Sequence, residues 1–147
     1  FDPTRTRNWR GGHWEWNIYC DPHAAAIVYR TPVVAHRSLG LDVTTQVTLG
    51  AEEVRRRFQT PLLRPVLDFA EVWFRSAEKI TFHDPLAATT IFDERICAFE
   101  RGEVSVELHD PDAFALTRWQ PRPDGRHEIA MRVDPARFFE AYFASFV

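Results

Sequence analysis

Residues 14–25 read WEWNIYCDPHAA and place a carboxylate, a carboxamide and a helix-start signal within a few positions. Glu15 and Asn17 are two residues apart, so in an extended segment their side chains would point the same way. Such a pair could grip vicinal hydroxyls, with Glu15 accepting hydrogen bonds and Asn17 both donating and accepting. The alternative interpretation is a surface strand followed by a helix cap, and the residues alone do not choose between the two.

Asp-Pro pairs predict three helix starts, the first of them within residues 14–25 and the other two later in the chain. An aspartate at the N-cap accepts from free backbone N–H groups, and a proline at the first helical position loses nothing by lacking its own. Each of the three pairs precedes an apolar run: Asp21-Pro22, Asp84-Pro85 and Asp134-Pro135. Apolar residues at helical spacing also predict a short helix over 51–59 and a longer one from about Thr60 to Ala77.

Strand-like segments lie between the predicted helices. The short apolar run at 32–35 directly follows a helix and is typical of a buried parallel strand. Segments 97–99 and 104–108, with Gly102 between them, predict a hairpin, and segments 114–120 and 128–133 predict two further strands. A single strand in the first sixty residues cannot form a parallel sheet alone, so we expect an α/β fold, the back end of a larger domain.

Composition excludes several classes of protein. The chain has 147 residues, 45% of them apolar, which is enough for the core of one domain. A net charge of −3 argues against non-specific nucleic-acid binding, and no stretch approaches the ~20 apolar residues of a membrane span. Cys20 and Cys97 lack metal-type spacing. We therefore expect reduced thiols in a cytoplasmic protein without a nucleic-acid or membrane partner.

His83 and Asp84 form a second polar pair at a predicted helix start. Asp84 could cap the helix with one oxygen and offer the other to Ca²⁺ or Mg²⁺, which bind oxygen ligands. His83 could donate a proton, because imidazole titrates near working pH. The alternative is that Asp84 serves only as an N-cap and that His83 is an ordinary loop residue.

Three segments together resemble the inosine-uridine preferring nucleoside hydrolase family. They occur in the family's order and at suitable separations: 14–25, 40–47 (GLDVTTQV) and 83–87 (HDPLA). Segment 133–139 (VDPARFF) is similar to the family's C-terminal strand-to-helix segment. The resemblance spans nearly the whole chain. It implies an open, mostly parallel, Rossmann-like α/β domain, here its C-terminal part with an antiparallel hairpin, that hydrolyses the N-glycosidic bond of ribonucleosides to free base and ribose in nucleoside salvage.

The resemblance also implies roles for particular residues. Glu15 and Asn17, with Trp16 between them, would bind the ribose hydroxyls. Asp84 would be a calcium ligand, and His83 would protonate the leaving base. In that mechanism the calcium ion holds two ribose hydroxyls and a water that an aspartate activates, and a bound cation lowers the pKa of such a water.

Four further residues are weaker candidates. The family's ribose-binding asparagine aligns with Trp9 here, and Asn8 would take its place after a one-residue insertion. Trp73, beside Phe74, is a candidate to pack on the base, although a role in core packing is the alternative. Asp42 and Thr44 could shape the site from behind, with a turn role as the alternative.

The family's Asp-rich calcium motif has no counterpart in this sequence. We therefore expect residues 1–147 to be the C-terminal half of a single nucleoside hydrolase domain. Its N-terminal half would supply the general base and most calcium ligands, so the isolated chain is expected to be inactive. The expected partners are a nucleoside, that N-terminal half and further copies in a homo-oligomer. Two alternatives stay open: a non-catalytic nucleoside- or ribose-binding relative, and a structural fragment that packs on a partner chain.

Overall fold

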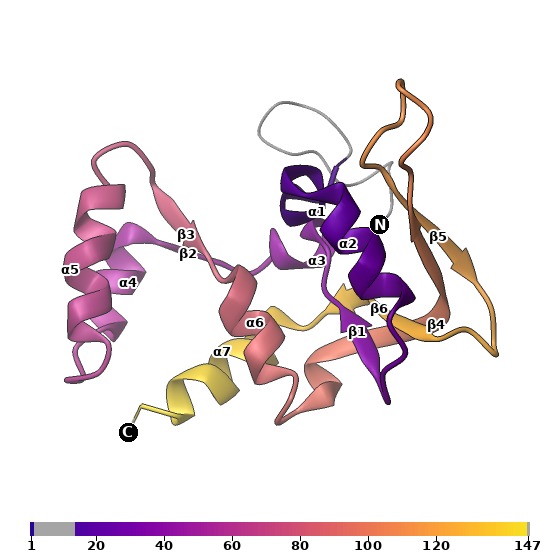
Figure 1. Cartoon of the computed structure of the whole chain (residues 1–147). Helices are drawn as coiled ribbons and strands as arrows, with labels where there is room; N and C mark the ends of the chain where they lie inside the picture. The colour runs from indigo at the N-terminus through magenta and orange to yellow at the C-terminus, as the bar shows by residue number, and fades with distance from the viewer. Residues whose placement is uncertain (2–13, 147) are drawn as a thin grey trace. The chain divides into compact units, whose positions relative to one another are not determined.

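The computed structural model describes residue 1 and residues 14–146. The chain divides into two units, and each is described by itself. The first unit comprises residues 1–43 and 97–132, and the second comprises residues 44–96 and 133–147. Figure 1 labels the helices and strands of both units.

A four-stranded sheet organises the first unit, with the strand order β1-β6-β4-β5 (Figure 1). Its strands are β1 (His36–Ser38), β4 (Cys97–Val106), β5 (Thr117–Pro121) and β6 (His127–Val133). β1 runs parallel to β6, with His36 opposite His127, and β4 runs antiparallel to β5, with Val106 opposite Thr117. The expected α/β class is therefore confirmed, and its antiparallel hairpin is formed by β4 and β5 rather than by the predicted segments 97–99 and 104–108.

Two helices precede β1: α1 (Trp16–Cys20) and α2 (Pro22–Arg30). The Asp21 carboxylate accepts a hydrogen bond from the N–H of Ala24 at 2.9 Å, and Pro22 occupies the first helical position. This confirms the helix start predicted at Asp21-Pro22, because both local signals satisfy the free end of the helix. α2 packs against β4.

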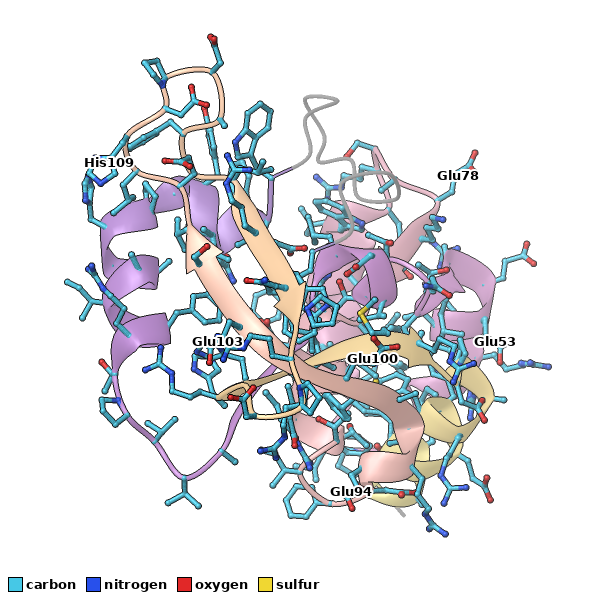
Figure 2. All side chains as sticks on the ribbon, turned by 90° about the vertical axis from the view of Figure 1, so that its right-hand side faces the viewer. Glu53, Glu78, Glu94, Glu100, Glu103 and His109 are labelled. Atoms are coloured by element: carbon cyan, nitrogen blue, oxygen red, sulfur yellow. The ribbon has the colours of Figure 1, made fainter. Side chains whose placement is uncertain are left out.

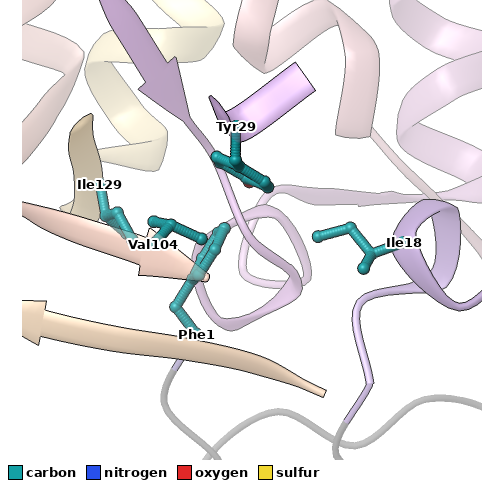
Figure 3. Packing of buried hydrophobic residues seen from close by; sticks show 5 residues of the cluster. All are labelled: Phe1, Ile18, Tyr29, Val104 and Ile129. Carbon is teal, nitrogen blue, oxygen red and sulfur yellow. The ribbon is translucent and has the colours of Figure 1, made fainter. Parts of the chain in front are cut away.

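A buried apolar cluster joins these helices to the sheet (Figure 3). Its members come from α1, α2, β4, β6 and the first residue: Phe1, Ile18, Tyr29, Val104 and Ile129. Burying such side chains contributes roughly 1.5–3 kcal/mol each. Ile18 thus anchors α1, and with it the residues at the start of that helix.

The predicted strand at 32–35 is wrong, and the parallel strand begins one step later, at His36. Val33 and Val34 are exposed. The His36 ring instead stacks on Tyr29 at 4.7 Å between centroids and meets the edge of His127 at 5.1 Å. The pairing with β6 begins where these rings pack, so the apolar run before it is left as a loop.

The predicted turn around Gly102 is also wrong, because β4 continues through it as one ten-residue strand. A Cβ atom at Gly102 would lie 2.3 Å from the carbonyl oxygen of Gln120 and 2.3 Å from the Trp119 ring. A Cβ atom at Gly125 would lie 2.2 Å from the carbonyl oxygen of Gly102. Gly102 therefore permits a close approach of neighbouring chain rather than a turn.

The second unit contains four helices and one 3₁₀ turn around a small antiparallel sheet. Its helices are α4 (Ala51–Arg57), α5 (Arg64–Trp73), α6 (His83–Thr89) and α7 (Pro135–Ala144), with the 3₁₀ turn η1 at Glu94–Ile96. Its strands are β2 (Thr48–Gly50) and β3 (Lys79–Thr81), neither of which was predicted. The short helix α3 (Leu41–Thr44) contains the boundary between the two units, which lies between Val43 and Thr44.

The predicted helices of this unit are confirmed with altered bounds. The Asp134 carboxylate accepts from the N–H of Arg137 at 3.0 Å, so α7 begins as its Asp-Pro pair predicts. α5 is shorter than the predicted 60–77. The buried Phe82 ring meets Phe138 and Phe139 of α7 edge to face, at 5.7 and 5.3 Å between centroids. These contacts fix the residue that directly precedes α6.

Candidate functional site

His83 and Asp84 are the first two residues of α6, and both are exposed. The predicted N-cap role of Asp84 is wrong, because the N-cap position belongs to Phe82. The buried Phe82 ring and a hydrogen bond from its N–H to the carbonyl of Val47 at 2.9 Å fix the chain one residue earlier. The Asp84 carboxylate therefore lies in the first turn of α6 and does not cap the helix.

The imidazole of His83 is held by Thr44. Nδ1 of His83 lies 2.8 Å from the hydroxyl oxygen of Thr44, which is buried. Partial shielding of the ring from water lowers the pKa of His83 from its ordinary value, and the neighbouring Asp84 carboxylate opposes that shift. The sequence motif at 40–47 had pointed to Thr44 only as a residue behind the site.

Glu15 has a different environment in the first unit. It is the N-cap residue of α1 and is buried, with 8% of its surface exposed. Its carboxylate accepts from the backbone N–H of Leu41 at 2.9 and 3.0 Å. Sequence reasoning missed Leu41 as a partner, because the contact joins residues 26 positions apart.

Burial raises the pKa of the Glu15 carboxyl, while the hydrogen bond from the Leu41 N–H acts in the opposite direction. Space beside the carboxylate is restricted at Gly40. A Cβ atom at Gly40 would lie 2.5 Å from Oδ1 of Asp42 and 2.6 Å from Oε1 of Glu15. Position 40 therefore requires glycine, because any other side chain would collide with the carboxylates of Glu15 and Asp42.

The segment after Glu15 is helical rather than extended. Because α1 begins at Trp16, Glu15 and Asn17 do not share the parallel direction that an extended segment would give them. Trp16 is 41% exposed, and Asn17 is also exposed. The extended geometry is a wrong prediction, and ribose binding by these three residues stays a prediction.

The remaining candidates have separate outcomes. Trp73 is the last residue of α5; its ring is exposed, and its indole N–H donates to the carbonyl of Lys79 at 2.9 Å. A role for Trp73 in packing on a base stays a prediction. Asn8 and Trp9 lie outside the described residues.

The described residues do not by themselves form a metal centre. Among them, no three His, Cys, Asp or Glu side chains come together in a group that could hold a metal ion. Ca²⁺ takes six to eight oxygen ligands. Asp84 could supply one such ligand, so a calcium site would need oxygens from outside this part of the chain. Within the same described part, no helix has the length and apolar character needed to cross a bilayer.

A cavity of about 890 Å³ in the first unit is a separate feature. Glu103 of β4 and His109 of the following loop line it, and Figure 2 labels both. Two of its arginines pair with nearby acids: Arg126 pairs with Glu103 at 3.4 Å, and Arg118 pairs with Glu107 at 3.2 Å. Among the predicted site residues that the structure describes, none lines this cavity.

Comparison with known proteins identifies the family. The model of the inosine-uridine preferring nucleoside hydrolase family matches residues 4–140. A curated inosine-uridine preferring nucleoside hydrolase from Leishmania major is 30% identical over 139 residues, which is 85% of this chain and 43% of the relative. A pyrimidine-specific ribonucleoside hydrolase, RihA, from Photobacterium profundum is 27% identical over 72% of this chain and 38% of its own length.

Solved structures agree on the fold. The purine-preferring ribonucleoside hydrolase from Gardnerella vaginalis superposes with a TM-score of 0.73 at 25% identity, over 90% of this chain and 46% of that one. This chain therefore spans about two fifths of the length of the curated relatives that it matches. The family model covers well over half of the sequence, and the Rossmann-like α/β fold is shared. The chain belongs to the inosine-uridine preferring nucleoside hydrolase family.

Proposed function

We propose that the protein containing this chain hydrolyses the N-glycosidic bond of ribonucleosides to free base and ribose. The observation that carries the proposal is the family match over residues 4–140, which includes every candidate residue named above. The similar proteins include both a purine-preferring and a pyrimidine-specific ribonucleoside hydrolase. Membership of the family therefore leaves the preferred base of this protein open.

His83 has the chemistry of the proton donor in this reaction. When the bond between the anomeric carbon and the base nitrogen breaks, the electron pair leaves with the base, and a proton on that base improves its departure. Nδ1 of His83 is engaged by Thr44, so the opposite nitrogen, Nε2, is the one available to meet a base. The exposure of His83 on α6 supports this role.

Asp84 is proposed as one ligand of a calcium ion, with the other oxygens supplied by residues outside this chain. When bound, such an ion would lower the pKa of a water molecule and orient the ribose hydroxyls. The exposed carboxylate of Asp84, which takes no part in capping α6, supports this assignment. Glu15, Trp16 and Asn17 are proposed as ribose-binding residues on the resemblance alone.

The experiment uses a protein that includes this chain together with the remaining length of its relatives. We expect it to release free base and ribose from inosine or uridine, as followed by chromatography. Binding of a nucleoside without release of base, measured by calorimetry, would instead support the non-catalytic alternative. A protein that neither binds any common ribonucleoside nor releases base from one would contradict the proposal.

The calcium assignment has its own test in the same protein. Asp84→Asn is expected to weaken calcium binding by at least about tenfold, since loss of supporting ligand interactions typically costs 10–100-fold in metal affinity. Asp68→Asn is the matched control, because Asp68 is an exposed carboxylate of the same unit whose nearest cation is Arg64 at 3.7 Å. Equal calcium titrations for the two variants would remove Asp84 from the site.

A further inference from the structure

Thr44 and His83 are 39 residues apart in the sequence, yet their side chains meet at a single hydrogen bond. The distance from Nδ1 to the hydroxyl oxygen is 2.8 Å, which is a normal length for such a bond. Thr44 is only 4% exposed, so its hydroxyl is shielded from water that could replace the contact. A buried hydroxyl of this kind needs a partner in the protein.

The backbone around the two residues holds them in register. β2 and β3 pair antiparallel, with Thr48 opposite Thr81, and the N–H of Phe82 extends this ladder by donating to the carbonyl of Val47. The N–H of Val47 in turn donates to the carbonyl of Thr44 at 3.1 Å. Val47 and Phe82 are both buried. The chain that carries Thr44 is thereby fixed beside the chain that carries His83.

A ring that passes the Nε2 proton to a leaving base begins as the imidazolium, with a proton on each nitrogen, and ends as the neutral ring with its proton on Nδ1. In both forms Nδ1–H can donate to the hydroxyl oxygen of Thr44, which lies 2.8 Å away. The Nε2 proton moves to the base, which leaves in its protonated form.

We propose that Thr44 is a positioning residue, whose hydroxyl oxygen accepts from Nδ1–H of His83 and keeps Nε2–H directed toward the substrate. The inference rests on the proposed function of His83 as the proton donor. It adds to that function a residue that fixes both the tautomer and the orientation of the donor.

Three variants of the complete protein test the inference. Thr44→Val removes the hydroxyl and preserves the shape of the side chain, while Thr44→Ser keeps the hydroxyl. Thr90→Val is the matched control, because Thr90 is also 4% exposed and its hydroxyl donates to the carbonyl of Ala87 within α6. Thermal denaturation of each variant shows whether it is folded.

The first readout is the nitrogen-15 spectrum of histidine side chains, recorded at about pH 8, where an ordinary imidazole is neutral. The His83 signals are assigned from the spectrum of His83→Asn. We expect the Nδ1-protonated tautomer in the wild type, Thr44→Ser and Thr90→Val, and a mixture of tautomers in Thr44→Val. A wild-type ring protonated on Nε2, or a Thr44→Val spectrum identical to wild type, would overturn the inference.

The second readout is the rate of turnover. Thr44→Val is expected to lower kcat about tenfold on a purine nucleoside, part of the 10²–10⁴-fold that a general acid contributes. It should have little effect on 4-nitrophenyl riboside, whose leaving group needs no proton. Thr44→Ser should restore the rate, and Thr44→Val should cost nothing further in a His83→Ala background. Equal losses on both substrates, or additive losses in the double variant, would overturn the inference.

The two levels of proposal fail separately. A wild-type protein that releases no base from any nucleoside overturns the proposed function in the turnover assay. The nitrogen-15 spectrum detects the hydrogen bond between Thr44 and His83 without any turnover. A failure of the positioning role therefore cannot be mistaken for a failure of the enzyme assignment.

Discussion

Glu15 in the first unit and His83 in the second are held in opposite ways. The Glu15 carboxylate is buried and receives a main-chain donor, the N–H of Leu41. His83 is exposed, and a single side-chain bond to Thr44 orients it. Burial makes the geometry of Glu15 part of the stability of the fold, whereas altering His83 costs less stability because it removes one side-chain hydrogen bond. Variants of the two residues should therefore separate stability from turnover.

The largest expected effect is on stability, from Glu15→Ala. Removing the carboxylate leaves the Leu41 N–H without its acceptor, and breaking a buried charged contact costs about 3 kcal/mol in the free energy of unfolding. Urea denaturation measures this loss. Glu100→Ala, on the exposed side of β4, is the control and should change the free energy by less than about 0.5 kcal/mol. A loss below about 1 kcal/mol for Glu15→Ala would contradict the comparison.

His83→Ala should show the reverse pattern. We expect kcat on a purine nucleoside to fall about 100-fold, or about 2.7 kcal/mol of activation free energy, through loss of the general acid. The free energy of unfolding should fall by only about 1 kcal/mol, because the imidazole is exposed but its removal leaves the buried Thr44 hydroxyl without this partner. His109→Ala, an exposed histidine in the other unit, should leave kcat unchanged. If His83→Ala lowered the free energy of unfolding as much as Glu15→Ala, the two residues would not differ in their contribution to stability.

Gly40→Ala tests how tightly the Glu15 environment is packed. The added Cβ atom would lie 2.5–2.7 Å from Asp42, Glu15 and Phe1, so we expect a loss of about 2 kcal/mol in the free energy of unfolding. Gly50→Ala is the matched control, because its Cβ atom would meet nothing closer than the carbonyl of Glu78 at 4.0 Å. Similar denaturation midpoints for the two variants would show that the site around Glu15 has room to adjust.

The smallest expected effect is the pH dependence of Glu15→Gln. The pKa of Glu15 is raised in the folded protein above the ordinary value of 4.5, mainly by burial. Its contribution to stability is therefore fully present below about pH 4.5 and is lost as pH rises through the raised pKa. Denaturation across this window should show the wild type losing stability relative to Glu15→Gln as pH increases. A relative gain for the wild type would reverse the sign of the pKa shift.

Local signals in the sequence predicted local structure well. Asp21 and Asp134 cap α2 and α7 as their Asp-Pro pairs indicate, because capping is decided within three residues. The same pair at Asp84 misled, since a buried neighbour, Phe82, takes the N-cap position. β2 and β3, with three residues each, are too short to produce a recognisable period. Glycine at 102 indicated a turn, whereas the structure uses it for close packing.

In the candidate site, too, local features could be predicted from the sequence and long-range contacts could not. His83 and Asp84 could be selected from their residue types and their place at a helix start. Their supporting contacts could not, because the Thr44–His83 and Glu15–Leu41 bonds join residues 39 and 26 positions apart. Composition and periodicity report only on near neighbours along the chain. Contacts of this range come from tertiary packing, which in this case follows the β2–β3 ladder and the core around Ile18.

The contact between Gly102 and Gly125 has an evolutionary consequence. A side chain at Gly125 would have to occupy the space of the Gly102 backbone, and one at Gly102 would meet the carbonyl of Gln120 and the Trp119 ring. Main-chain atoms cannot be exchanged for smaller ones, so no second substitution can compensate for a first at Gly125. We expect these two positions to be closed to neutral drift and to serve as fixed reference points when distant sequences of this family are aligned.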